Sequence, residues 1–149
     1  MKRFFDFLFS LIAFAGLILL FLLIAFLIKL TSDGPILHWS DRVGRKNRIF
    51  KMPKFRSMYT HTPDDKATHL LQNPDIYITK LGKFLRLTSL DEIPQFICVI
   101  SGEMSLVGPR PALFNQKDLI ELRKLHGVDN LLPGITGWAQ INGRDKLSI

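Results

Sequence analysis

The stretch Phe7–Ile28, FLFSLIAFAGLILLFLLIAFLI, decides how the rest of the chain can be arranged. Its 22 residues carry no charge, and only Ser10 and Gly16 are not hydrophobic. As a helix it would be roughly 33 Å long, close to the ~30 Å hydrocarbon thickness of a bilayer. A cleaved signal peptide would have a shorter apolar region, of about 7–15 residues, followed by a small-residue cleavage site. The stretch therefore predicts a membrane-embedded helix.

Charged residues flank this apolar stretch on both sides. The basic residues on its C-terminal side are Lys29, Arg42, Arg45, Lys46, Arg48, Lys51, Lys54 and Arg56. Because positive flanks remain on the cytoplasmic side of a membrane, we expect the bulk of the chain in the cytoplasm. Lys2, Arg3 and Asp6 precede the stretch, which mildly favours a re-entrant helix but leaves a spanning one open. Re-entry needs a break in the helix, and Gly16 is the weak point of a segment without proline.

The chain is predicted to have two parts, a membrane helix over residues 1–30 and a small cytoplasmic domain over residues 31–149. The net charge is +7, and the first 29 residues hold three basic residues and one acid, which leaves +5 for the remainder. A basic domain beside a membrane favours anionic lipid headgroups or anionic substrates as partners. Cys98 is the only cysteine and has no partner for an internal disulfide, which is typical of a reducing compartment.

The second part is predicted to be mostly α with little β. Apolar residues at helical spacing predict amphipathic helices within Ile76–Leu90 and Asn115–His126, and basic helices of this kind can lie on a membrane surface. Alternating apolar and basic residues predict a strand within Ile49–Met58, at a sheet edge because of Pro53. Segments rich in polar or turn residues, which we expect to be loops, are Asp41–Arg48, Tyr59–Pro74, Gly102–Pro111 and Leu131–Arg144.

Several kinds of function lack their sequence patterns. The histidines, His38, His61, His69 and His126, are scattered without the spacing of zinc ligands. The sequence contains no Walker loop, dinucleotide-binding fingerprint or Gly-x-Ser-x-Gly motif. No nucleic-acid-binding motif accompanies the basic charge, so we expect no nucleic acid partner.

Asp91 and Glu92 form an adjacent pair of carboxylates with two interpretations. Ser89 lies three residues before Glu92, so Ser89-Leu90-Asp91-Glu92 fits a capping box at the start of a helix. In the functional interpretation, one carboxylate attacks or accepts a proton and the other holds a metal. Mg²⁺ is the metal that suits one or two carboxylates together with phosphate oxygens.

Arg110 is the second candidate, because prolines on both sides fix its backbone. An arginine held in this way can bind phosphate with two parallel hydrogen bonds. The plain alternative is an exposed loop arginine. A further glycine-rich loop, Pro133–Arg144, allows the close backbone approach that phosphate sites use.

These segments together resemble one family. They are Lys2-Arg3-Phe4-Phe5-Asp6, Ser32-Asp33-Gly34-Pro35, Asp41-Arg42-Val43-Gly44, Lys54-Phe55-Arg56-Ser57-Met58, Leu87-Thr88-Ser89-Leu90-Asp91-Glu92, Gly102–Pro111 and Pro133–Arg144. In sequence they are similar to the monotopic phosphoglycosyl transferases, the bacterial sugar transferases that begin surface polysaccharide or glycoconjugate assembly. The resemblance covers nearly all of the chain.

The resemblance implies a two-step transfer at the cytoplasmic face of the bacterial inner membrane. Asp91 looks like the nucleophile that takes a phosphosugar from a UDP-sugar and releases UMP, and a polyprenyl phosphate such as undecaprenyl phosphate then accepts the phosphosugar. Glu92 looks like the Mg²⁺ ligand, and Arg110 and Arg86 look like phosphate ligands. The family's membrane element is re-entrant, which implies the same topology here.

The sequence departs from the family's pattern in two places. A proline commonly breaks the family's membrane helix, but Leu17-Ile18-Leu19-Leu20 stands at that position here. Family members usually continue beyond the Asn142-Gly143-Arg144 motif, so this chain is expected to lack a C-terminal segment. The alternatives to an active enzyme are therefore a truncated, non-catalytic membrane-anchored member of the family and a basic binder of anionic lipid. The sequence predicts neither the sugar nor the oligomeric state.

Overall fold

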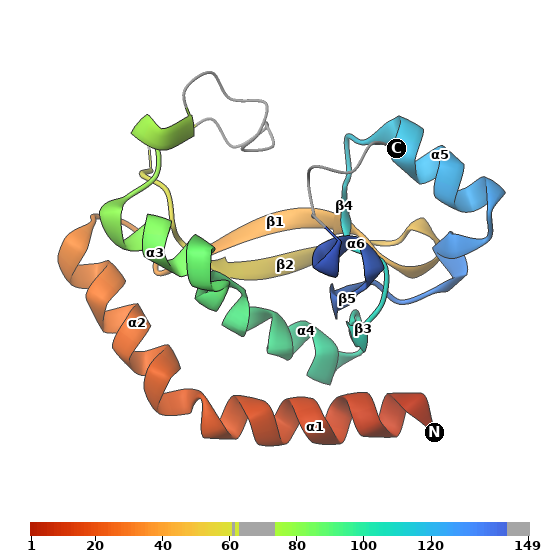
Figure 1. Cartoon of the computed structure of the whole chain (residues 1–149), viewed down its shortest axis with the longest axis horizontal. Helices are drawn as coiled ribbons and strands as arrows, with labels where there is room; N and C mark the ends of the chain where they lie inside the picture. Colours follow the sequence, from red (N-terminus) through yellow and green to blue (C-terminus); the bar gives the residue numbers. More distant parts are fainter. Residues whose placement is uncertain (61, 63–73, 143–149) are drawn as a thin grey trace.

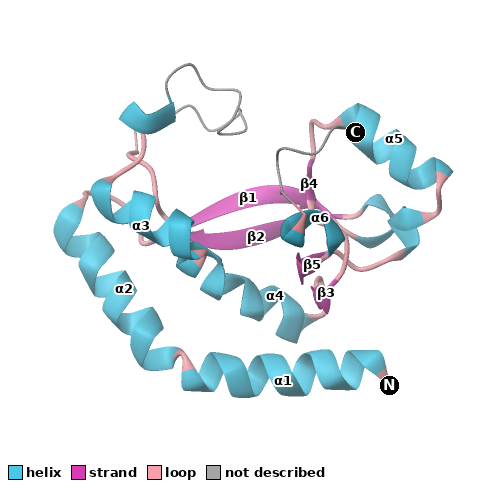
Figure 2. Ribbon diagram, viewed as in Figure 1, coloured by secondary structure: helices cyan, strands magenta, loops and turns pink. Residues whose placement is uncertain are grey.

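The structure is a computed structural model that describes residues 1–60, 62 and 74–142. Helices take up about 55% of the described residues, so the prediction of a mostly helical chain is confirmed. The prediction of little β was too low, because two small sheets form the frame on which the helices pack (Figure 2). Most of the loop predicted over Tyr59–Pro74 lies outside the described residues.

The apolar stretch forms two helices, α1 (Lys2–Gly16) and α2 (Ile18–Thr31), with a bend of 59° between them. The bend falls beside Gly16, the predicted weak point, where glycine's low helix propensity favours a break. The backbone remains paired across it, because the Leu17 amide donates to the Ala13 carbonyl and the Phe21 amide to the Leu17 carbonyl. Within the described part of the chain, no single helix has the length and apolar character to cross a membrane, whereas this bent pair has both when taken together.

The helix pair borders two sides of the remaining structure and leaves much of its apolar surface uncovered (Figure 1). The exposed apolar side chains along it are Phe4, Phe5, Phe7, Leu8, Phe9, Leu11, Ile12, Ile18, Leu19, Leu22, Leu23, Phe26 and Leu30. Exposed apolar side chains in this number along two helices are typical of contact with a membrane or a partner.

The larger sheet has the strand order β2-β1-β4, with antiparallel neighbours. Strand β1 (Leu37–Val43) pairs along its whole length with β2 (Ile49–Phe55), and β4 (Ala112–Leu113) pairs with the end of β1. The edge strand predicted around Pro53 is confirmed. The loop predicted over Asp41–Arg48 is wrong for its first three residues, because they complete β1; the turn that follows contains a short 3-10 helix, η1 (Arg45–Asn47).

Two hydrophobic core clusters form where helices pack against strand β2. After a short 3-10 turn, η3 (Pro74–Ile76), helix α3 (Lys80–Thr88) leads into the 3-10 helix η4 (Leu90–Gln95) and then α4 (Phe96–Ser101). One core cluster joins the last two turns of α2 to β2, α3 and η4, through Ile24, Ala25, Ile28, Phe55, Leu85 and Ile93. The other joins β2 to α4, through Phe50, Met52, Cys98, Val99 and Met104.

The smaller sheet contains β3 (Ser105–Val107) and β5 (Gly134–Thr136), which are parallel. Both strands lie in segments predicted to be loops, so those predictions are wrong for these residues. Between them come β4, then α5 (Lys117–Leu125), which confirms the second amphipathic helix, and η5 (Val128–Asn130). A one-turn helix, α6 (Trp138–Ile141), follows β5.

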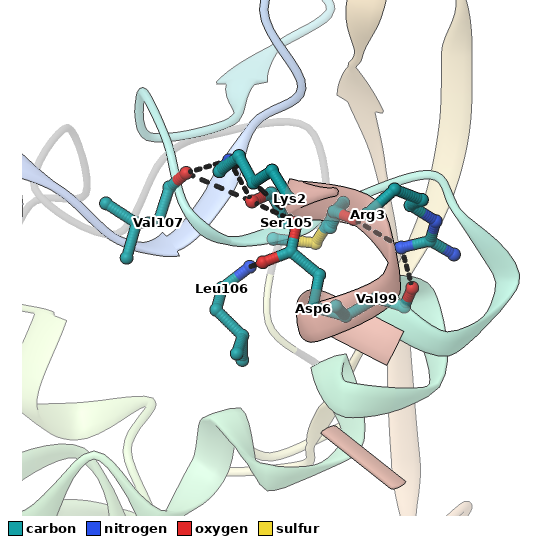
Figure 3. Close-up of polar contacts among 8 residues, drawn as sticks. Lys2, Arg3, Asp6, Val99, Ser105, Leu106 and Val107 are labelled. Atoms are coloured by element: carbon teal, nitrogen blue, oxygen red, sulfur yellow. Dashed lines mark hydrogen bonds and ion pairs between the residues drawn. The ribbon is translucent and has the colours of Figure 1, made fainter. Parts of the chain in front are cut away.

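Arg3 ties the first turn of α1 to the end of α4. Its guanidinium donates to the Val99 carbonyl (Figure 3) and, at 2.9 Å, to the Ile100 carbonyl. Both carbonyls lie in the last turn of α4, where backbone carbonyls lack their usual helical donors, although Val99 also accepts from the Gly102 amide at 3.2 Å. Gly102 follows with a φ of 96°, and a Cβ there would press on the guanidinium. Arg3 therefore caps α4 from another helix.

Lys2 and Asp6 tie the same end of α1 to β3. The Asp6 carboxylate accepts from the Ser105 hydroxyl at 2.9 Å and from the Leu106 amide at 3.3 Å (Figure 3). The Lys2 ammonium donates to the Ser105 hydroxyl at 2.6 Å and to the Val107 carbonyl at 3.0 Å. Asp6 and Ser105 are buried, so these contacts satisfy polar groups that water does not reach.

The far end of the helix pair is attached to the same body by Arg56. Its guanidinium donates to the carbonyls of Ser32 and Asp33, both at 2.7 Å, just beyond the end of α2. Both ends of the bent pair are thus bound to the structure formed by residues 37–142. The division into parts at residue 30 remains a prediction.

Candidate functional site

Asp91 and Glu92 lie in the first turn of η4, directly after α3. The capping-box interpretation of Ser89 is wrong, because its side chain makes no cap hydrogen bond and its backbone is left-handed, with a φ of 59°. The left-handed backbone of Ser89 therefore separates α3 from η4, and the two acids follow directly. Thr88, directly before Ser89, donates to the Phe84 carbonyl at 2.9 Å within α3.

Lys54 is the residue that contacts this acidic pair most closely. Its ammonium nitrogen lies 2.7 Å from Glu92 Oε1, and the two side chains are 20% and 13% exposed. Lys54 comes from the end of β2, which packs along η4. The sequence analysis placed Lys54 in a motif but gave it no role. The alternation along β2 predicted the strand, but a partner 38 residues away left no signal in the sequence.

Asp91 is 7% exposed, and this burial raises its pKa above the ordinary value of an aspartate. Lys54 lowers the pKa of Asp91, Glu92 raises it, and Arg86 lowers it. Burial also lowers the pKa of Arg86, an effect that the Asp91 charge opposes. The predicted pair Asp91 and Arg86 is therefore close enough for each charge to act on the other.

Ser57 holds the Arg86 side chain. The Arg86 Nε donates to the Ser57 hydroxyl at 2.8 Å, and Ser57 is buried. The Ser57 carbonyl also accepts from the Thr79 amide at 3.1 Å, just before α3. Gly82 allows this close packing, because a Cβ there would collide with the Ser57 backbone. Arg86 is thus fixed from its own helix and from the end of β2.

Arg110 and Glu92, two of the predicted site residues, line one hollow beside the sheet. The hollow is lined by Arg42, Met52, Lys54, Glu92, Gln95, Arg110, Pro111, Gly134, Ile135 and Gln140. Its free volume of about 10 Å³ is close to the least that one water molecule needs. Residues with guanidinium, ammonium and carboxylate groups therefore line a space about the size of one water molecule.

Two glycine-rich segments hold Arg110 in this place. The Gly108 amide donates to the Thr136 carbonyl and the Gly134 amide to the Pro109 carbonyl, both at 2.9 Å. A Cβ on Gly108 or Gly134 would collide with the facing backbone. The predicted close approach of these loops is therefore between the two segments themselves, and it fixes the backbone on the N-terminal side of Arg110.

The groups around Glu92 suit a hard divalent cation such as Mg²⁺. Glu92 supplies carboxylate oxygens and the Gln95 amide shares the hollow with it, whereas Asp91 does not line the hollow. Oxygen donors of this kind, completed by substrate phosphate oxygens, are usual ligands of Mg²⁺. Among the described residues, no cluster of three or more acidic, histidine or cysteine side chains is arranged to hold a metal. The donor set therefore fits a cation shared with a phosphate-bearing substrate.

A separate hollow lies where β1 ends at Val43, against α5 and η5. It contains Arg123 and Asp129 among apolar side chains and none of the four predicted site residues. Lys54, Glu92 and Arg110 all line the hollow at Glu92, so that hollow is the better candidate for a reaction.

Comparison with known proteins shows the family to which the chain is similar. Residues 1–149 match the family described as bacterial sugar transferase. Undecaprenyl-phosphate glucose phosphotransferase of Komagataeibacter xylinus is 43% identical over 150 residues, which cover 95% of this chain and 28% of the relative. UDP-glucose:undecaprenyl-phosphate glucose-1-phosphate transferase of Escherichia coli K12 is 48% identical over 124 residues, with coverages of 80% and 26%.

A shorter relative is covered over most of its length. The exopolysaccharide production protein ExoY of Sinorhizobium fredii is 35% identical over 161 residues, which cover 99% of this chain and 71% of that protein. The chain spans only about a quarter of the length of the two glucose-phosphate transferases. The similarity nevertheless extends from the apolar helices to the last residues, and the chain belongs to the bacterial sugar transferase family.

Proposed function

We propose that this chain transfers a sugar phosphate from a UDP-sugar to undecaprenyl phosphate, as the first step of surface polysaccharide or glycoconjugate synthesis. The observation that carries the proposal is the buried Asp91, adjacent to Glu92 and acted on electrostatically by Lys54 and Arg86. The names of the relatives, which act on undecaprenyl phosphate, support the general reaction.

In the first step, a carboxylate oxygen of Asp91 attacks the β-phosphorus of the UDP-sugar. The bond from this phosphorus to the oxygen that bridges the two phosphates breaks, and UMP leaves with the electron pair. The sugar phosphate is then joined to Asp91 as an acyl phosphate. A covalent intermediate of this kind divides one difficult displacement into two easier ones.

In the second step, a phosphate oxygen of the lipid attacks the same phosphorus. The bond to the Asp91 oxygen breaks, which restores the carboxylate and yields a polyprenyl diphosphate sugar. Arg86 and Arg110 neutralise negative charge on the phosphate groups through both steps. Glu92 would hold Mg²⁺, which supplies further neutralisation of the diphosphate charge when bound.

The helix pair supports placing this reaction at the cytoplasmic face of the inner membrane. A helix that spans the bilayer would separate its ends by the ~30 Å hydrocarbon core. Here Arg3 near one end and Arg56 beyond the other bind the same body. We therefore infer that α1 and α2 enter and leave the membrane on one side, with their exposed apolar surface in lipid. Phe84 and Leu87, both exposed on α3, support contact of that amphipathic helix with the interface.

The test is incubation of the full chain, in detergent or lipid nanodiscs, with Mg²⁺ and a panel of UDP-sugars. We expect UMP release from at least one donor and, without a lipid acceptor, a covalent sugar-phosphate adduct on Asp91 in the mass spectrum. An Asp41→Asn variant is the matched control, because Asp41 lies on β1 in an exposed ion pair with Lys51. A folded, membrane-bound chain that releases no UMP from any donor would support the non-catalytic alternative.

A further inference from the structure

Arg56 and Ser57 follow β2 directly and bind two different parts of the chain. Arg56 is 6% exposed, and its guanidinium donates to the carbonyls of Ser32 and Asp33 and to the Ser32 hydroxyl, each at 2.7 Å. Ser57 accepts from the Arg86 Nε at 2.8 Å. Two consecutive residues therefore join the end of the membrane helix pair to a residue of the candidate site.

The surroundings of Arg56 hold it firmly. Its amide donates to the Ile36 carbonyl at 2.9 Å, one residue beyond the paired strands β1 and β2. Gly34 has a φ of 115°, and a Cβ there would collide with the Arg56 guanidinium. Because the planar guanidinium keeps its donors in a fixed arrangement, several acceptors at once make it a rigid link.

Ser57 is held on its other side by the segment that begins α3. Its carbonyl accepts from the Thr79 amide at 3.1 Å, and Met58 pairs with Ile78 in an isolated β-bridge. The peptide unit between Arg56 and Ser57 is planar and rigid, so a displacement of one residue is passed to the other. Residues 56–58 therefore connect the end of α2 with the start of α3.

Arg3 provides the comparison at the opposite end of the helix pair. Like Arg56, it donates to two successive backbone carbonyls, here those of Val99 and Ile100. Neither Val99 nor Ile100 adjoins a predicted site residue in sequence. Two arginines thus attach the same helix pair in the same way, but it is Arg56 that adjoins the acceptor of Arg86.

We propose that Arg56 is a positioning residue for the reaction, because it holds Ser57 where that residue fixes Arg86 beside Asp91. This inference rests on the proposed function of the same site. When Arg56 loses its partners at the end of α2, Ser57 can move away from Arg86, which then neutralises phosphate charge less well. Attachment of the helix pair becomes a condition for the full rate of transfer.

Hydrogen exchange at the Arg86 Nε tests this link without turnover. Its N–H signal is followed by nitrogen-15 NMR of the full chain in detergent or nanodiscs, and it is identified by its loss in Arg86→Lys. In the wild type, the bond to Ser57 slows exchange with water. We expect exchange to be at least about tenfold faster in Arg56→Met and in Ser57→Ala. Arg3→Met is the matched control and should leave the exchange rate unchanged.

UMP release tests the consequence for the reaction. It should fall about tenfold in Arg56→Met, because Arg86 is less well placed, and stay within a few-fold of the wild type in Arg3→Met. Since Arg56 and Ser57 act through the same arginine, the double variant Arg56→Met/Ser57→Ala should lose about tenfold rather than about a hundredfold.

Unchanged exchange at Arg86 in Arg56→Met overturns the proposal, as does an additive loss in the double variant or an equal effect of Arg3→Met. If methionine prevents folding, Ser32→Ala removes one acceptor of Arg56 from the side of α2. Exchange should then be about two- to threefold faster, and no change would also overturn the proposal. A chain that releases no UMP but shows the faster exchange keeps the link to Arg86 and loses the transferase.

Discussion

Two aspartates of this chain are almost equally buried, Asp6 at 6% and Asp91 at 7% exposure, yet their surroundings differ. Asp6 accepts hydrogen bonds from the Ser105 hydroxyl and the Leu106 amide, and Lys2 lies 3.9 Å away. Asp91 has Glu92 as its neighbour, and burial raises its pKa. Burial of a carboxylate thus serves attachment in one region and, in the proposed function, reactivity in the other.

The contrast shows where the fold gains and loses stability. A buried carboxylate that receives hydrogen bonds stabilises the folded chain, because its unfolded alternative is only solvation by water. A buried carboxylate whose pKa is raised is less stable as an anion in the folded chain than in the unfolded chain. We therefore expect substitution at these two positions to change stability in opposite directions.

The largest effect is expected from Asp91→Asn. UMP release should fall by at least about 10³-fold, because the amide cannot form the acyl phosphate. Above about pH 4 the ionised aspartate opposes folding, so the neutral asparagine should raise Tm. Activity assays and differential scanning fluorimetry measure the two effects, with Asp41→Asn as the control for both. Full activity would remove Asp91 as the nucleophile, and a lower Tm would contradict its unfavourable burial.

Asp6→Ala should act in the opposite way. It leaves the Ser105 hydroxyl and the Leu106 amide without their carboxylate acceptor, at a cost of about 1–3 kcal/mol. For a chain of this size we expect Tm to fall by roughly 3–10 °C, while UMP release well below Tm stays within a few-fold of the wild type. Asp75→Ala is the control, because Asp75 forms an exposed ion pair with Lys83 and its loss should hardly change Tm. An unchanged Tm in Asp6→Ala would show that the contacts to β3 contribute nothing.

Ser57→Ala should produce an intermediate effect confined to the site. Without the Ser57 hydroxyl, Arg86 loses the acceptor that fixes its guanidinium near Asp91, and UMP release should fall about tenfold. Tm should change little. Ser101→Ala, which removes an exposed hydroxyl bonded to the Cys98 carbonyl, serves as the control. Unchanged activity in Ser57→Ala would mean that the rest of α3 positions Arg86.

The smallest effect concerns the thiol of Cys98. Cys98 is buried in α4, and burial together with Glu103 raises its pKa to about 12, so almost no thiolate is present at pH 8. We expect no alkylation of the folded wild type by iodoacetamide within hours, and a rate a few-fold higher in Asp6→Ala, whose attachment beside α4 is weaker. Asp91→Asn should match the wild type. Rapid alkylation of the wild type would show that the attached end of α1 opens readily.

Patterns within a short stretch of sequence were enough to predict helix α5 and the bend between α1 and α2. The helical spacing of Leu119, Leu122 and Leu125 matches α5, and the single glycine of the apolar stretch marks the bend. Strand β1 was missed because Asp41 interrupts the alternation of apolar Leu37, Trp39 and Val43 with polar residues. Pairing with β2 on one side and β4 on the other supplies the stability that its own sequence does not indicate.

Candidate site residues were likewise predicted only where a local sequence pattern marks them. Asp91 and Glu92 are adjacent, and Arg110 stands between prolines, so each carried a signal of its own. Their roles remain predictions. The contacts of Lys54 with Glu92 and of Ser57 with Arg86 join residues 38 and 29 positions apart, and only the folded chain brings them together. The same is true of Asp6, whose partner Ser105 is 99 positions away.

The bonds of Lys2, Arg3 and Asp6 also set an order of events during synthesis. Their partners lie 96 to 105 positions later in the chain. At about 5–20 residues per second, the ribosome needs on the order of 5–20 s to complete those partners after the first helix has emerged. The nascent apolar helix pair therefore has to be sheltered, by lipid or by a chaperone, before the contacts that attach it can form.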